Sequence, residues 1–302
     1  MLTYMTAWLR YYHPREFITA YLNNATNEDD IVSGTKLAKV YGIKIEKPVF
    51  GKSLGNYSIA DNGSIIKGIG SVLYVSNNCA EGLFNLAKST KGYSFPEIAL
   101  QIFDNKIADT RQLGVLAKLD FFREFGHSRT IFEFLDRVKQ YNGKKQVDKD
   151  KVPRGTEHII LDCIKEGIDG FSETNKMYKF DYKVLLTRMF EAMPQVDYSK
   201  KDKIIHQLSY LGYIQDKEMV TGLSIGTVVT NKTRYDSYKI DFINGSSGWL
   251  KFKDYLDQPK KGQMILITSE MNELRNNGRS KDRVVVDYEV IELDRNIQAN
   301  KK

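Results

Sequence analysis

The residues with the sharpest chemical signature lie in one short stretch, Lys67, Gly68, Ile69, Gly70 and Ser71. Two glycines around an apolar residue permit a tight turn and a close approach of the backbone to a ligand. A helix that follows such a turn directs its free N–H groups and positive dipole end at an anion. With the charge of Lys67 added, the stretch predicts a phosphate contact that does not read base sequence. An ordinary turn before a core helix is the alternative.

Aromatic and basic residues alternate nearer the C-terminus, a pattern that suits base stacking and contact with a phosphate backbone. We expect Tyr238 and Lys251 to face outward, because they alternate with apolar positions, and Phe242, Trp249 and Phe252 to fill the core. The basic loop over 275–281 is the better contact candidate. The full candidate set is Lys232, Arg234, Tyr235, Tyr238, Lys251, Lys253, Arg275, Arg279 and Lys281.

No catalytic set can be assembled from this sequence. A nucleotidyl transferase needs carboxylates that hold two metal ions, and the one Asp-x-Asp, Asp148 and Asp150, lies in a charged stretch without a strand. The four histidines lack the paired spacing of metal ligands. P-loop, dinucleotide and nucleophile-elbow motifs are missing. We therefore expect no catalytic residue, metal or other cofactor on this chain.

The composition is that of a globular protein with a modest positive charge. Hydrophobic residues make up 41% and charged residues 27% of the 302 residues, and the net charge is +7. This charge fits a polyanionic partner such as nucleic acid. Cys79 and Cys163 have no metal-ligand spacing, and neither a signal peptide nor a bilayer-spanning run is recognisable. We expect a cytoplasmic protein that does not contact a membrane.

The elements that position these residues change in type along the chain. Apolar residues recur at helical spacing over much of the first two thirds, with extended segments over 43–66. Five later runs predict strands, at 222–230, 237–243, 249–252, 264–271 and 284–293. Five short strands are the layout of a small OB-type barrel. The predicted fold class is α+β multidomain, with an N-terminal helical region that carries helix-hairpin-helix motifs and a C-terminal five-stranded OB-type β-barrel.

Several stretches, taken in order, resemble the C-terminal half of the bacterial DNA polymerase III alpha subunit, the C-family replicase. Residues 3–17 look like the family's "YP-x-EF" stretch late in its fingers domain, and 41–48 and 53–59 resemble the two segments that follow. Residues 66–70 are similar to its "IKGVG" hairpin, and 116–126 to its "LI-x-AGAFD-x-x-G" element. Residues 211–214 resemble the "LG-x-Y" stretch before its OB domain.

The resemblance implies duplex binding by the hairpin region, template-strand contact by the OB domain and association with a sliding clamp. The family's clamp-binding peptide has no clean match in this sequence. The segment with Gln207, Leu208, Tyr210 and Leu211 is pentapeptide-like, but it overlaps the "LG-x-Y" stretch. The second hairpin unit, over 104–125, lacks the glycine expected near Lys118. The palm region with its metal-binding aspartates has no counterpart here, so the chain by itself is expected to be inactive.

The resemblance also gives a predicted division into domains. The parts are the helical end of a fingers-like region over 1–64, a helix-hairpin-helix domain over 65–141, a charged linker or loop over 142–155, a helical connecting region over 156–219, an OB-fold domain over 220–295 and a tail over 296–302.

We therefore predict the DNA-binding C-terminal portion of a split or truncated C-family polymerase from a bacterium or a phage. It would contact primer–template duplex and single-stranded template while a separate chain supplies the palm. Two alternatives remain open at this point. One is a non-replicative repair or recombination factor, and the other is a regulator that mimics the polymerase tail to bind the clamp or its loader.

Overall fold

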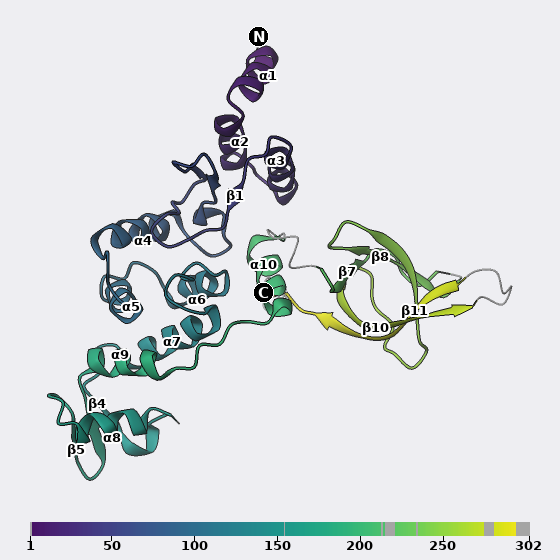
Figure 1. The fold of residues 1–302 in the computed structure, drawn as a ribbon. Helices are drawn as coiled ribbons and strands as arrows, with labels where there is room; N and C mark the ends of the chain where they lie inside the picture. The colour runs from purple at the N-terminus through teal and green to yellow at the C-terminus, as the bar shows by residue number, and fades with distance from the viewer. Residues whose placement is uncertain are drawn as a thin grey trace. The chain divides into compact units, whose positions relative to one another are not determined.

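The computed structural model describes residues 2–153, 155–212, 214, 221–233, 235–274 and 281–293. The chain divides into two compact units, Met1–Tyr198 and Ser199–Lys302. The first unit is mainly helical, and the second contains a closed five-stranded barrel (Figure 1). The predicted α+β class with a C-terminal OB-like barrel is confirmed.

The first unit begins with three helices, α1 (Leu2–Tyr12), α2 (Pro14–Asn23) and α3 (Glu28–Val40). Pro14 is the first residue of α2, where its missing N–H breaks no helical hydrogen bond. Ile18, Leu22 and Ala38 are buried between α2 and α3. By contrast, Tyr4, Trp8 and Tyr11 of α1 are exposed, and Tyr4 retains 75% of its accessible surface.

A small three-stranded sheet follows, in the order β1-β3-β2. Its strands are β1 (Ile45–Glu46), β2 (Ser58–Ile59) and β3 (Ile65–Ile66), and the 3-10 turn η1 (Ile69–Ser71) comes directly after it. Ile65 pairs with both Ile45 and Ile59 and is fully buried. The extended segments predicted over 43–66 therefore form this sheet.

Five further helices build the largest part of the first unit, with a core of phenylalanine rings. They are α4 (Asn77–Ser89), α5 (Phe95–Asp104), α6 (Thr110–Lys118), α7 (Ser128–Tyr141) and α9 (Tyr182–Ala192). Phe95 packs against Phe134 and Phe190, with ring centroids 5.8 and 5.6 Å away. These contacts join α5, α7 and α9 although α9 lies much later in the sequence.

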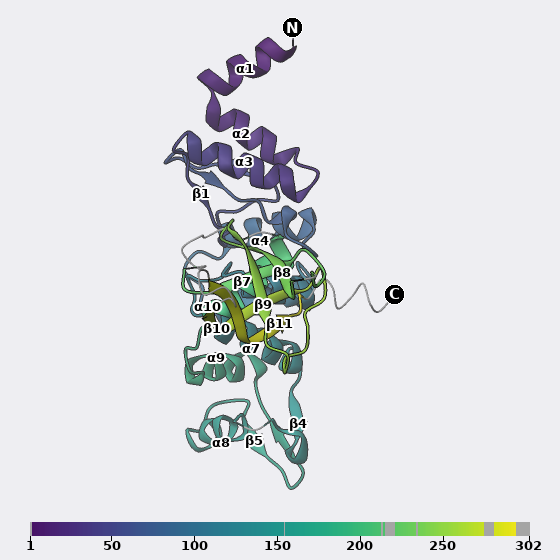
Figure 2. The same cartoon turned by 90° about the vertical axis from the view of Figure 1, so that its right-hand side faces the viewer.

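The structure differs from the expected linker or loop over 142–155. Strand β4 (Gln146–Asp148) and the 3-10 turn η2 (Lys149–Lys151) lie there, in a sheet ordered β4-β6-β5 with β5 (Ser172–Glu173) and β6 (Met177–Lys179). Helix α8 (Glu157–Lys165) lies beside the sheet in both views (Figures 1 and 2). A charged residue of this stretch contacts another element, because Lys149 of η2 forms an ion pair with Glu173 of β5.

The second unit is a barrel preceded by helix α10 (Lys200–Leu211). Its strands are β7 (Ser224–Val228), β8 (Ser237–Phe242), β9 (Ser247–Phe252), β10 (Met264–Leu274) and β11 (Lys281–Ile291). Alternate residues point inward, so Ile240, Leu250, Ile265 and Val285 are fully buried in its core. Ile204 and Leu208 of α10 pack on a second apolar cluster formed with β7, β10 and β11.

Candidate nucleic-acid interface

The hairpin stretch at 67–71 lies between β3 and α4, but its amides face the protein. The N–H groups of Ile69 and Gly70 donate to the carbonyl oxygens of Leu54 and Gly55, at 2.9 and 2.8 Å. Ser71 Oγ donates to the Gly68 carbonyl at 3.0 Å. The two amides expected to meet a phosphate therefore already have protein partners.

The two glycines allow this close packing. A Cβ atom added at Gly68 would lie 2.3 Å from the carbonyl oxygen of Gly55, and one at Gly70 would lie 2.2 Å from Asn77 Oδ1. Gly68 has a φ of −72°, an ordinary value for any residue. The glycines are thus needed because another segment of backbone passes beside them, and not because of an unusual turn.

Lys67 needs a corresponding correction. Its side chain is 1% exposed, whereas the prediction placed its charge beside a phosphate at the surface. Burial lowers the pKa of the Lys67 ammonium to about 7, because a charge is poorly solvated in the interior.

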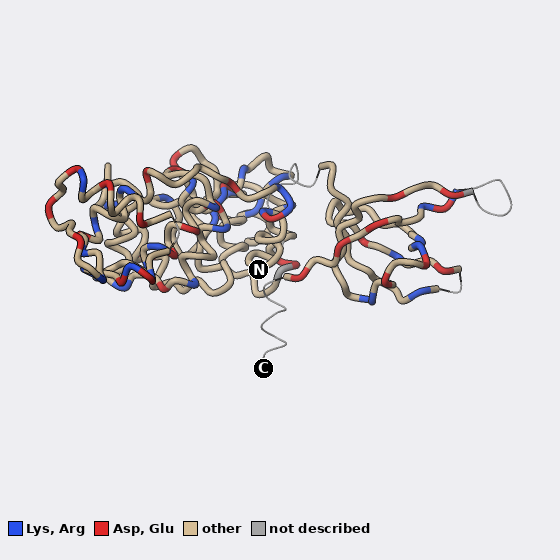
Figure 3. The backbone as a smooth tube through the Cα atoms, turned by 90° about the horizontal axis from the view of Figure 1, so that it is seen from below, with Lys and Arg blue, Asp and Glu red and all other residues tan. Residues whose placement is uncertain are grey.

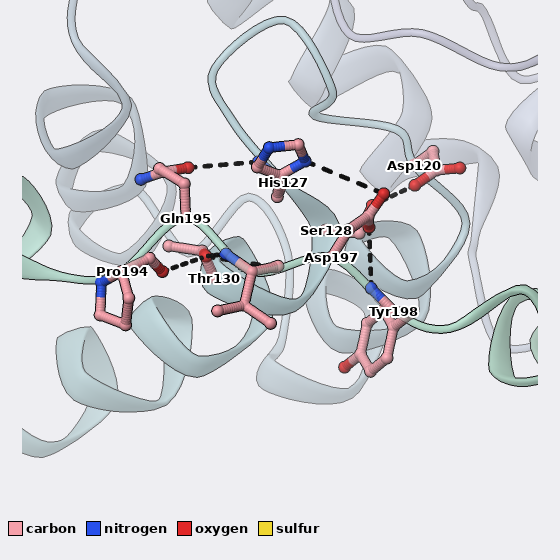
Figure 4. Close-up of polar contacts among 9 residues, drawn as sticks. Asp120, His127, Ser128, Thr130, Pro194, Gln195, Asp197 and Tyr198 are labelled. Carbon is pink, nitrogen blue, oxygen red and sulfur yellow. Dashed lines mark hydrogen bonds and ion pairs between the residues drawn. The ribbon is translucent and has the colours of Figure 1, made fainter.

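The second predicted hairpin unit, over 104–125, lacks the glycine expected near Lys118, but the chain still forms a turn there. Helix α6 ends at Lys118, and Asp120 takes a left-handed φ of 62°. Ser128 Oγ donates a hydrogen bond to the Asp120 carboxylate (Figure 4). The short polar side chain of aspartate tolerates this conformation better than most residues do, so the turn forms on a residue that sequence reasoning did not single out.

The same figure shows how the chain between α9 and the second unit is fastened to the start of α7. Thr130 Oγ1 donates to the Pro194 carbonyl and accepts from the Val196 N–H, both at 2.9 Å (Figure 4). His127 lies 3.8 Å from the Asp197 carboxylate. Thr130 is 1% exposed, so these hydrogen bonds are shielded from water.

The barrel has the strand arrangement of an OB-fold. Around the closed sheet the order is β7, β8, β9, β11, β10 and back to β7, and β9 runs parallel to β11. In OB-folds, the face of the second and third strands and the loops beside it bind oligonucleotides. The corresponding face here is the outer surface of β8 and β9.

Trp249 is the most prominent side chain on this face, and sequence reasoning missed it. It was expected to fill the core, yet it is 54% exposed. Its neighbour across the strand pair is Lys239, and Lys251 follows two residues later on the same side of β9. The buried residues Leu250 and Phe252 alternate with Trp249 and Lys251, so strict alternation along β9 was the signal that could have found it.

Tyr238 is another correction, since it was expected to face outward. It is 3% exposed, its ring packs edge-on against Phe252 at 5.3 Å, and it belongs to the barrel core. Its hydroxyl lies 3.3 Å from Gln258 Oε1, which satisfies the polar end of a buried tyrosine. The core face of β8 includes Ile240, two residues away, and Tyr238 follows the same alternation.

Three of the predicted lysines are paired with carboxylates. Lys251 lies 2.8 Å from Asp282, and Lys232 lies 3.2 Å from Asp236. Lys253 is hydrogen-bonded to Glu273, which raises the pKa of this lysine. Tyr235 and Lys281 are exposed at the surface. Arg234, Arg275 and Arg279 lie outside the described residues.

The segment predicted to bind a sliding clamp is part of helix α10. Gln207, Leu208, Tyr210 and Leu211 all have helical backbone, and Leu208 is buried in the apolar cluster beneath the barrel. A peptide that inserts into a groove must be free to leave its own fold, which a core residue of α10 is not. In this structure the segment is part of a packed helix, and its binding to a clamp stays a prediction.

Within the described ranges, no group of three or more histidine, cysteine, aspartate or glutamate residues is placed to hold a metal ion. The Cys79 thiol is buried, and this burial raises its pKa to about 11. No helix in the same ranges has the length and apolar character needed to cross a bilayer.

The fold and the exposed face define the class of this protein: an α+β protein whose C-terminal unit is an OB-type barrel with an aromatic residue between two lysines. Comparison with known proteins narrows the class. No family model matches the chain. A region of it is related to the DNA polymerase III alpha subunit of bacteria, at about 27% identity over roughly half of the chain.

Three relatives illustrate this similarity. The DNA polymerase III alpha subunit of Borreliella burgdorferi is 26% identical over 140 residues, which is 46% of this chain. That of Campylobacter jejuni is 27% identical over 149 residues, and that of Vibrio cholerae is 28% identical over 94 residues. The matched regions span only 12%, 12% and 8% of the three relatives.

Proposed function

We propose that this chain is a DNA-contacting component of a C-family replicative polymerase, which holds template strand while a separate chain carries the palm active site. The observation that carries the proposal is the outer face of β8 and β9, where Trp249 lies between Lys239 and Lys251. An aromatic ring stacks on any unpaired base, and lysines meet the phosphates on either side. The relation to polymerase alpha subunits supports the replicative setting.

Single-stranded template is the ligand that this face suits best. The bases of a duplex are stacked on one another, so they have no free surface for Trp249. Duplex contact by the first unit remains part of the proposal, but its basis must differ from the predicted hairpin, because the Ile69 and Gly70 amides have protein partners. The division into fingers-like, hairpin and connecting domains also stays a prediction.

Fluorescence anisotropy with a primed template that has a long single-stranded overhang tests the proposal. The intact chain should bind at low salt, and its affinity should fall as salt is added, because phosphate contacts release counterions. The chain alone should not extend the primer, and extension should appear when a palm-bearing polymerase chain is added. An absence of binding at low salt would overturn the proposal.

A further inference from the structure

The barrel has an unexpected balance of charge for a nucleic-acid-binding unit. Its described residues between 221 and 293 contain eight lysines and arginines but ten aspartates and glutamates. Positive and negative residues are interspersed over its backbone (Figure 3). With the undescribed positions of the same stretch included, the numbers are eleven and ten. A barrel with so little net charge has no strong general attraction for a polyanion.

The carboxylates are not scattered at random, because two of them meet the lysines at the end of β9. Lys251 lies 2.8 Å from Asp282, whose side chain is only 14% exposed. Lys253, two residues further along, is hydrogen-bonded to Glu273. Asp282 and Glu273 are directly opposite each other on β11 and β10. One pair of strands thus supplies the partners of both lysines.

We infer that Asp282 and Glu273 are specificity-determining residues that make the barrel prefer single strands over duplex. The inference rests on the proposed function of the β8–β9 face. Each carboxylate competes with a DNA phosphate for a lysine. Contact with the phosphate backbone of DNA alone therefore contributes little binding energy. A single strand also stacks a base on Trp249, whereas a duplex depends on the phosphate contacts that the carboxylates weaken.

Neutralising both carboxylates tests the inference. The probes are a 20-nucleotide oligothymidine and a blunt 20-base-pair duplex, and the protein is the intact chain with Asp282→Asn and Glu273→Gln. Duplex affinity at low salt should rise about tenfold, and the salt slope should steepen by ~0.9 per released lysine. Affinity for oligothymidine should rise about threefold or less, because stacking already contributes there. The preference for single strands should therefore decrease.

A matched control removes the same amount of charge elsewhere in the barrel. Asp257→Asn and Glu292→Gln change two carboxylates that have no ion pair with Lys251 or Lys253 among the described residues. These substitutions should leave the preference for single strands unchanged. Thermal unfolding of both double variants verifies that the fold is retained.

The other outcomes are informative. Equal gains on both probes, or an equal change in the control variant, would mean that the carboxylates act only through net charge, and the inference would be overturned. An unchanged preference in the neutralised variant would overturn it as well, while binding by the unmodified chain would leave the proposed function intact. If the unmodified chain binds neither probe, both the proposed function and this inference fail.

Discussion

At the scale of single residues, the burial of Trp249 and of Lys67 is the opposite of what their residue types suggest. Tryptophan is usually assigned to a core and lysine to a surface. Here Trp249 is 54% exposed, and Lys67 is 1% exposed. The alternation of β9 places Trp249 on the outer face. Lys67 directly follows strand β3 and precedes the closely packed Gly68.

Trp249→Ala should weaken binding to single-stranded DNA by about 1–3 kcal/mol, the contribution of one stacked base. The folded barrel should be unaffected, since an exposed ring contributes little to the core. Anisotropy with oligothymidine measures the change. Tyr93→Ala, which removes a 44% exposed ring from the first unit, is the control and should bind as the unmodified chain does.

Lys67→Met should remove a pH dependence of stability. The pKa of this lysine is about 7 in the folded chain, against 10.5 for a lysine that water fully solvates, as in the unfolded chain. Between pH 7 and pH 10.5 the unfolded chain binds more protons than the folded chain does. The free energy of unfolding therefore increases as the pH rises over this range and decreases as the pH falls towards 7. The difference in the free energy of unfolding between the unmodified chain and the variant should therefore change from pH 7 to pH 9.5.

Urea unfolding at several pH values gives that difference. At pH 7 the variant should be more stable by about 1–3 kcal/mol, because the apolar side chain needs no hydration. Lys52→Met changes an exposed lysine and should show the same pH profile as the unmodified chain. Parallel profiles for Lys67→Met and the unmodified chain would contradict a buried amine with a lowered pKa.

At the scale of elements, the turn from β3 through η1 to α4 is a packing device in the first unit. Leu54 and Gly55 accept hydrogen bonds from Ile69 and Gly70, so two chain segments lie in direct backbone contact. Only glycine leaves room for such an approach. The glycine pattern that predicts a phosphate-binding hairpin is therefore equally well explained by this internal contact.

Gly68→Ala should destabilise the first unit by about 1–3 kcal/mol, the usual effect of overpacking. The added carbon would lie 2.3 Å from the Gly55 carbonyl oxygen and 2.4 Å from the Asn56 carbonyl carbon, so backbone must move. Thermal unfolding measures the loss. Gly248→Ala places its carbon at ordinary contact distances and should change stability little. A Gly68 variant of unchanged stability that binds duplex poorly would restore the hairpin interpretation.

At the scale of the whole molecule, two units with separate apolar cores predict two unfolding transitions. The first unit has its phenylalanine core, and the barrel has a core that includes Leu250. Chains of several domains commonly depart from two-state unfolding. Scanning calorimetry of the intact chain should therefore resolve two transitions.

Leu250→Ala should lower the free energy of unfolding of the barrel by about 2–5 kcal/mol, and Leu116→Ala should do the same for the first unit. Both leucines are fully buried. Each substitution should shift one transition and leave the other in place. A common shift of both transitions by either variant would mean that the units unfold together.

The sequence by itself determined the succession of elements, since these depend on local patterns. Pro14 begins a helix, and the alternating runs after residue 221 form the five strands. The same alternation places Lys251 on the outer side of β9, between the buried Leu250 and Phe252. The resemblance to the polymerase alpha subunit also came from local motifs, and the similarity to three such subunits supports it.

Only the tertiary structure decided which groups remain available for a ligand. The Ile69 amide donates to the Leu54 carbonyl, and the Lys251 ammonium pairs with Asp282. The Leu208 side chain packs in the apolar cluster that α10 forms with β7, β10 and β11. Each partner is distant in sequence from the group that it occupies, so no local pattern reports it. Burial and pairing depend on long-range packing. For that reason the structure favours the outer face of β8 and β9, and not the glycine turn, as the candidate interface.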